Sequence, residues 1–204
     1  MAICLTCSSW SRNPLCVRCR RLLVPVGPVA EHGVEVCSGY RHETVARRLV
    51  HLLKYHGIVA AAVPLADAMA HRLPADTAGL IPVPRALVRR SRYGVDPAVE
   101  LATRVSRITG IPVLTLLRSR LWWPAHAGND RVSRRTPRFR LVDCAPSGAL
   151  LVDDVLTTGV TLATAGELVG VRRAVTGTRA CVAGFDRIGA DRQQQRSSFA
   201  KSTR

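Results

Sequence analysis

The chain has few aromatic residues and no long apolar run. Aromatic residues make up only 4% of its 204 residues, while 47% are hydrophobic. A sizeable core must therefore be built mostly from alanine, valine and leucine. The longest apolar stretch, residues 58–70, is interrupted by Pro64 and Asp67, so it falls short of the roughly 20 residues that a membrane-spanning helix needs. We therefore expect no membrane insertion.

The start of the chain lacks the features of a secretory signal. Residues 1–4 read Met-Ala-Ile-Cys, and neither a basic region nor an apolar segment is recognisable there. We therefore expect a cytoplasmic location. Because that compartment is reducing, its cysteines are expected to be thiols or thiolates rather than disulfides.

Lysine is nearly absent as well. Only Lys54 and Lys201 occur, so arginine supplies 28 of the 30 basic residues, and with 14 acidic residues the net charge is +16. A GC-rich genome is an alternative explanation for this excess of arginine over lysine. The positive charge attracts polyanions whatever its origin. It predicts non-specific attraction to nucleic acid that weakens as salt rises. The basic segments are residues 18–21, 89–93 and 118–140, and the last contains Trp122 and Trp123, a mixture suited to stacking on single strands.

Two common phosphate-binding motifs are missing, but a third kind of phosphate loop is present. There is neither a Walker A loop nor a G-x-G-x-x-G fingerprint. Residues 150–161 read Leu-Leu-Val-Asp-Asp-Val-Leu-Thr-Thr-Gly-Val-Thr, which predicts a buried strand over 149–152, then two acids, then a helix over 161–168. Asp153 and Asp154 are placed to accept hydrogen bonds from two neighbouring hydroxyls, and the helix N-terminus suits a phosphate. The alternative is that these acids and threonines only cap the helix.

Four cysteines near the N-terminus form two C-x2-C pairs. Their spacing is typical of structural zinc sites, in which four thiolates surround a tetrahedral ion and hold together a segment too short for its own core. Two disulfides or free thiols are the alternative, and iron in the same cage also stays open. The expected ligands are Cys4, Cys7, Cys16 and Cys19.

The segment 150–161 resembles the phosphoribosyl-pyrophosphate (PRPP) motif of type I phosphoribosyltransferases, and every position of that pattern is filled. The resemblance implies that Asp153 and Asp154 bind the ribose hydroxyls of PRPP and act in catalysis, with Mg2+ accompanying the substrate. It further implies that the 5-phosphate is held by the loop that follows, which consists of Leu156, Thr157, Thr158, Gly159, Val160 and Thr161.

A zinc ribbon followed by a PRPP-type domain is similar to the layout of the ComF family, which is associated with DNA uptake. Residues 40–57, ending in Lys-Tyr-x-Gly, and the Pro-Val-Pro loop at 82–84 also look like that family. By this resemblance, Pro84 and Arg85 meet the pyrophosphate, and residues 118–138 form the loop that closes over PRPP. Arg131 and Arg134 in that loop either neutralise pyrophosphate or contact nucleic acid.

We therefore expect an α/β protein with a type I phosphoribosyltransferase fold, a mostly parallel sheet flanked by helices. The expected divisions are a zinc ribbon (1–24), a linker and hood-like helical segment (25–78), a phosphoribosyltransferase-like core (79–185) and a basic disordered tail (186–204). Within them we expect a linker or short strands at 25–40, helices at 41–56, 60–73 and from Pro97 to Gly110, and further strands at 112–117 and 174–184.

The expected function is that of a PRPP-binding, ComF-type phosphoribosyltransferase that releases pyrophosphate. The alternative is a non-catalytic adaptor for DNA uptake and competence, in which the ribbon and the arginines contact single-stranded DNA or a helicase-like partner. In that case the PRPP site would be a sensor or a remnant.

Overall fold

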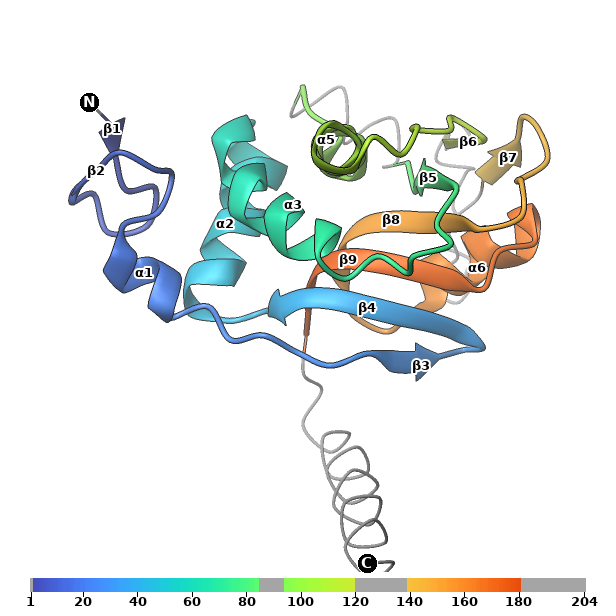
Figure 1. Ribbon diagram of the computed structural model, residues 1–204, viewed down its shortest axis with the longest axis horizontal. Helices are drawn as coiled ribbons and strands as arrows, with labels where there is room; N and C mark the ends of the chain where they lie inside the picture. Colours follow the sequence, from blue (N-terminus) through green and yellow to red (C-terminus); the bar gives the residue numbers. More distant parts are fainter. Residues whose placement is uncertain (1, 85–93, 120–138, 181–204) are drawn as a thin grey trace, which may run out of the picture.

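The computed structural model describes residues 2–84, 94–119 and 139–180 (Figure 1). Within these ranges, five strands form one sheet in the order β3-β4-β9-β8-β5. The strands are β3 (Val29–Glu31), β4 (Val34–Arg41), β9 (Arg173–Arg179), β8 (Ala149–Leu156) and β5 (Gly79–Pro82). Four of them run parallel, and β3 is antiparallel at one edge. The expected mostly parallel sheet is confirmed.

Helices cover both faces of this sheet, which explains why its inner strands are apolar on both sides. On one face lie α2 (Thr44–His56), the 3-10 turn η1 (Val59–Ala61), α3 (Ala62–Ala70) and α5 (Pro97–Thr109), while α6 (Val160–Val169) packs on the other. Side chains of β8 alternate between the two cores: Leu150 and Val152 join the first, and Ala149 and Leu151 join the second.

Helix α5 begins and ends at the residues that the sequence predicts. Asp96 is the N-cap residue, Pro97 follows at the first helical position, and Gly110 ends the helix in the left-handed conformation at φ 77°. Asp96 makes no capping hydrogen bond through its side chain. The start of this helix therefore depends on the extended backbone of Asp96 and on the proline that fixes the first turn.

A small N-terminal unit packs against α2. The antiparallel strands β1 (Ala2–Ile3) and β2 (Trp10–Ser11) precede the short helix α1 (Val17–Arg21). Its buried residues belong to the same apolar cluster as the core residues of α2, and Arg48 of α2 donates to the Leu5 carbonyl at 3.3 Å. The buried residues are Cys4, Leu15, Cys19 and Leu23. This unit therefore shares a core with the main domain.

Of the two alternatives expected for residues 25–40, the strands are confirmed: the segment contains β3 and most of β4, an interior strand paired with β9. Two other expected boundaries are corrected. The expected helix over 60–73 is shorter, since it begins as η1 and ends at Ala70. Residues 112–117 do not form a full strand. Only Val113 bridges to Leu80, and β6 (Leu117–Ser119) pairs instead with β7 (Phe139–Leu141).

The most consequential correction concerns β8. It continues to Leu156, so both acids lie inside the strand rather than after it. Strand β9 ends at Arg179, so it is shorter within the described residues than the expected strand over 174–184. Residues 181–184 of that expected strand, and the expected disordered tail, lie outside the described residues. No helix among the described residues combines the length and the apolar character needed to cross a bilayer.

Candidate functional site

Asp153 and Asp154 point to opposite faces of the sheet. Successive side chains alternate along a strand, so Asp154 continues the row of Val152 and Asp153 continues the row of Leu151. Asp154 is only 6% exposed, whereas Asp153 is partly buried. The two acids therefore have different environments, although they are neighbours in sequence.

Asp154 is held by a lysine from α2. The Lys54 Nζ atom lies 2.8 Å from Oδ2 and 3.1 Å from Oδ1 of Asp154. Lys54 occupies the last turn of α2, which ends at Gly57 in the left-handed conformation. A carboxylate so well buried needs a partner of opposite charge. The ion pair therefore explains how an acid can end a buried strand on this face.

The protonation of Asp153 depends on the groups around its carboxyl group. Burial, followed by repulsion from the Asp154 carboxylate, raises the pKa of Asp153 well above its usual range. Its Oδ1 atom accepts a hydrogen bond from the backbone N–H of Asp154 at 2.8 Å. A ligand that offers hydroxyl donors or positive charge would stabilise the ionised form of this side chain.

The loop after β8 leads directly into α6. Gly159 is the N-cap residue, with φ 75°, and no side chain caps the helix there. The alternative in which the acids or threonines serve as the N-cap is therefore wrong. The first N–H groups of α6 have no partners within the helix, which makes its N-terminus suited to an anion. Thr157 and Thr158 are exposed beside it, Thr161 is partly buried, and Leu156 anchors the loop in the core.

A comparison with known protein families identifies the domain that contains these acids and this loop. Residues 56–183, more than half of the chain, match the model described as the phosphoribosyl transferase domain. The chain belongs to this family. A search of curated proteins gave no match. Membership supports a PRPP-binding, phosphoribosyltransferase-like fold, and it covers the acids and the loop described above.

The expected pyrophosphate loop of the phosphoribosyltransferase domain begins beside the acids. Strand β5 pairs in parallel with β8, with Pro82 opposite Val152, and the Val83 N–H donates to the Val152 carbonyl at 2.9 Å. Pro84 thus leaves the sheet at the edge where Asp153 lies. Arg85, Arg131 and Arg134 lie outside the described residues, so their expected contacts with pyrophosphate stay predictions.

Two histidines contribute to this edge of the phosphoribosyltransferase domain, although neither attracts attention in the sequence. His42 follows β4, and its Nδ1 atom lies 2.8 Å from Oγ1 of the buried Thr178. Burial and the nearby Arg47 lower the pKa of His42. His32 is exposed, and its Nε2 atom lies 2.9 Å from the Thr158 carbonyl oxygen. The partner of His42 lies 136 positions away in the sequence and that of His32 lies 126 positions away, so no local sequence pattern predicts either contact.

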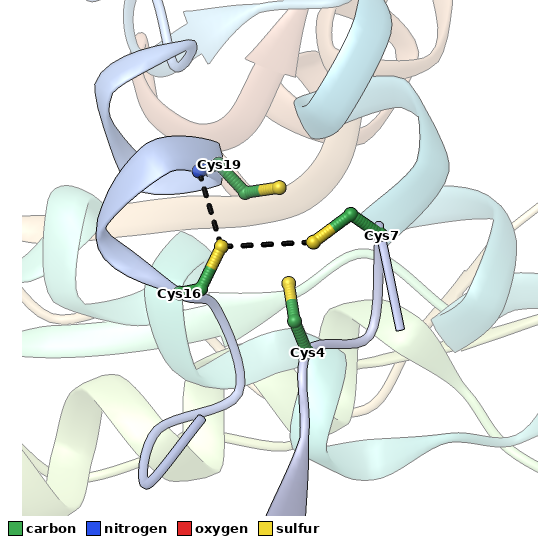
Figure 2. A group of neighbouring side chains, drawn as sticks. All are labelled: Cys4, Cys7, Cys16 and Cys19. Carbon is green, nitrogen blue, oxygen red and sulfur yellow. Dashed lines mark hydrogen bonds between the residues drawn. The ribbon is translucent and has the colours of Figure 1, made fainter. Parts of the chain in front are cut away.

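The side chains of the four predicted zinc ligands point toward one another in the N-terminal unit (Figure 2). Their sulfur atoms all lie within 4.8 Å of one another, and those of Cys7 and Cys16 are 3.6 Å apart. A tetrahedral zinc ion with bonds of about 2.3 Å needs sulfurs about 3.8 Å apart, so the cluster fits it. The six cysteines among the described residues, including these four, are free thiols in the structure.

The thiols of this cluster differ in their surroundings. Burial opposes ionisation of Cys4, but hydrogen bonds from backbone groups outweigh it and lower the pKa of Cys4 to about 6. Burial and the neighbouring thiols raise the pKa of Cys19 to about 12. Four sulfurs this close repel one another as thiolates unless a cation lies between them. The N-terminal cluster can therefore hold a zinc ion, as a zinc ribbon does.

Proposed function

We propose that this protein binds PRPP as its Mg2+ complex and transfers the phosphoribosyl group to an acceptor with release of pyrophosphate. The observation that carries the proposal is the acid pair of β8 leading into the glycine-capped N-terminus of α6, within a matched phosphoribosyltransferase domain. In this proposal, Asp153 and Asp154 accept hydrogen bonds from the ribose hydroxyls. Residues 156–161 hold the 5-phosphate through hydroxyls and backbone N–H groups.

The reaction breaks the bond between C1 of the ribose and the pyrophosphate oxygen, and a bond from the acceptor to C1 forms in its place. Positive charge develops on the ribose ring as the pyrophosphate leaves. Carboxylates fixed near the ring stabilise that charge without having to reorganise. The Lys54–Asp154 ion pair supports such a role because it holds one carboxylate in place before the substrate arrives.

The leaving group needs cationic or backbone donors on the other side of the ribose. We propose Pro84 and Arg85, after β5, together with Arg131 and Arg134 for this role. The parallel pairing of β5 with β8 supports the first two, because it starts this loop at the carboxyl edge that carries the acids. The guanidinium group suits pyrophosphate because it donates two parallel hydrogen bonds.

The N-terminal cluster is proposed to hold zinc as a structural ion. Its four thiolates leave no open position for a substrate or water, so its contribution is to the fold. A zinc ribbon joined to a phosphoribosyltransferase domain is the layout that we propose to be of the ComF type. The cysteine geometry and the family match support the two halves of that layout separately.

The decisive experiment is calorimetric titration of Mg2+–PRPP into the zinc-loaded full-length protein. We expect saturable binding that is lost in an Asp153→Asn, Asp154→Asn double variant. Asp143→Asn is the matched control, because it makes the same change at an exposed position on the loop that precedes β8. Absence of binding by the unaltered protein would reject the proposal. Binding would justify a screen of bases and amines for pyrophosphate release.

A second candidate function is single-strand binding by a non-catalytic DNA-uptake adaptor. One observation favours it: Trp10 is 76% exposed on the N-terminal unit, whose four arginines are exposed and which contains no acidic residue. The arginines are Arg12, Arg18, Arg20 and Arg21. Aromatic rings among arginines stack on unpaired bases.

The adaptor function is tested with a fluorescently labelled single-stranded oligonucleotide. We expect affinity to fall steeply with salt and to fall further in Trp10→Ala, but not in Ile108→Ala, which trims an exposed apolar residue on α5. Affinity that is insensitive to salt would contradict electrostatic binding.

A further inference from the structure

The turn between β3 and β4 packs against the loop that follows β8. Gly159 in that loop has φ 75°, and a Cβ atom added to it would lie 2.9 Å from Cβ of Glu31 and 3.2 Å from Cδ2 of His32. No side chain larger than hydrogen fits there without movement of the turn. The loop backbone and the turn are therefore in direct contact.

One hydrogen bond fixes this contact. The His32 Nε2 atom lies 2.9 Å from the carbonyl oxygen of Thr158. A carbonyl oxygen can only accept, so Nε2 must carry the hydrogen, which assigns the tautomer of a neutral ring. His32 and Gly33 both have positive φ, at 49° and 75°, as a two-residue hairpin turn of this hand requires. The turn thus presents the ring in a defined direction.

The hydrogen bond from His32 to the Thr158 carbonyl affects how well the loop can bind an anion. A phosphate beside the N-terminus of α6 is attracted by N–H groups and repelled by carbonyl oxygens that turn towards it. Because His32 holds the Thr158 carbonyl, the peptide unit between Thr158 and Gly159 has one orientation. The N–H groups that follow it are then set in advance for the anion.

The turn is anchored firmly enough to hold the loop. Val29 in β3 and Val34 in β4 pack in the same apolar cluster as Leu156 and Leu162, which flank the loop on either side. The turn and both ends of the loop are therefore fixed to one core. His32 lies before the matched segment, which begins at residue 56, so this contact is an addition from the N-terminal part of the chain.

We propose that His32 is a positioning residue for the 5-phosphate of PRPP, acting through the Thr158 carbonyl. The proposal rests on the proposed function, because it assigns the loop to that phosphate. His32 orders the loop so that less conformational freedom is lost when the phosphate binds. It does not contact the ribose or the pyrophosphate, so its effect is confined to ligands that carry the 5-phosphate.

The test uses Mg2+–PRPP, ribose 5-phosphate and Mg2+–pyrophosphate as three probes of the full-length protein. His32→Gly removes the donor and tolerates the positive φ, whereas His32→Gln keeps an N–H donor at a similar reach. One neutral hydrogen bond corresponds to a change in affinity of about threefold to tenfold. We expect His32→Gly to lose that much affinity for PRPP and ribose 5-phosphate, with pyrophosphate unaffected, and His32→Gln to recover most of the loss.

A matched control is His71→Ala. His71 is also exposed, and its Nδ1 atom lies 2.7 Å from a carbonyl oxygen, but that carbonyl belongs to Asp67 in α3, the helix that His71 follows. We expect this variant to bind all three probes as the unaltered protein does. Equal losses for pyrophosphate and ribose 5-phosphate in His32→Gly, or no loss at all, would overturn the proposal.

A second measurement uses the unaltered protein and so does not depend on the folding of a variant. The Nε2 nitrogen resonance of His32 should shift when ribose 5-phosphate is added and should not shift with pyrophosphate alone. An unchanged resonance at saturating ribose 5-phosphate would refute the role of His32 while leaving the proposed function intact. Failure of the unaltered protein to bind either PRPP or ribose 5-phosphate would overturn both.

Discussion

Lys54 and Asp154 form an ion pair that connects the last turn of α2 to the end of the interior strand β8, with Nζ and Oδ2 2.8 Å apart. The side chain of Asp154 is 8% exposed and that of Lys54 is 23% exposed, so water screens the pair only partly. Lys54 lies just before the segment that matches the family model. One of the two acids of the motif thus depends on a residue outside that segment.

Removal of Lys54 should destabilise the fold. Lys54→Met leaves a buried carboxylate without its cation, and we expect a loss of about 2–3 kcal/mol in the free energy of unfolding, since the lysine is partly exposed. Urea denaturation measures the loss. Adding Asp154→Asn to Lys54→Met should recover part of it, because the unpaired charge is then gone. Arg104→Ala breaks the more exposed pair with Glu100 and should cost less than about 0.5 kcal/mol.

Asp153 should give the protein a characteristic dependence on pH. The pKa of Asp153 is raised in the folded state, first by burial and then by the Asp154 charge. A carboxyl group whose pKa is raised by folding binds its proton more tightly in the folded state. The stability that this proton contributes is therefore fully present below the pKa of the unfolded state, about 4. It is lost as the pH rises through the pKa of the folded state. Asp153→Asn should remove this loss and be more stable than the unaltered protein near neutral pH.

Urea midpoints measured from acid to neutral pH test this prediction. The two proteins should converge at the acid end and separate as pH rises. PRPP binding should show the opposite trend in the unaltered protein, because the ribose hydroxyls require the ionised acceptor. If the difference between the proteins did not change with pH, Asp153 would not be the group that titrates.

Loss of zinc should weaken the main domain as well as the N-terminal unit. Cys4, Cys19 and Leu15 belong to the same apolar cluster as the core residues of α2. We therefore expect Cys7→Ser to lose the metal, to unfold at a lower temperature and to bind PRPP more weakly, because α2 carries Lys54. Cys144→Ser is the control, since Cys144 is equally exposed but lies far along the chain from the cluster. Unchanged PRPP affinity in a zinc-free protein would show that the two units are independent.

The sequence predicts those parts of the fold that depend on local patterns. The caps of α5, the start of α6 and the four clustered cysteines follow from spacing and residue type alone. The pattern over residues 25–40 left a linker and short strands as alternatives, because the place of β4 in the sheet is set by pairing with β9, far away in the chain. The roles of His42 and His32 depend on that same pairing and turn. The sequence shows local propensities, but it does not show how strands far apart in the chain pair with one another.

The strand β8 illustrates the same limit within the motif itself. A run of apolar residues followed by two acids suggests that the strand ends where the charges begin. It continues because Asp154 is neutralised by Lys54, a residue 100 positions earlier, and because Asp153 pairs opposite Thr176 of β9. A partner from a distant helix therefore allows the strand to continue through the acids.

The last prediction separates the conformational role of Gly159 from its packing role. Gly159 and Gly170 flank α6 and have nearly the same φ, 75° and 71°, but a Cβ at Gly159 meets Glu31 and His32, whereas at Gly170 nothing lies within 4 Å. An alanine at either position incurs about 1–2 kcal/mol of left-handed strain. Gly170→Ala should show that loss of stability alone. Gly159→Ala must also displace the β3–β4 turn, so we expect it to be less stable than Gly170→Ala and to bind ribose 5-phosphate more weakly, as measured by urea denaturation and calorimetry. Equal stability and equal affinity in the two variants would show that the turn yields freely and that its contact with the loop has no role in binding.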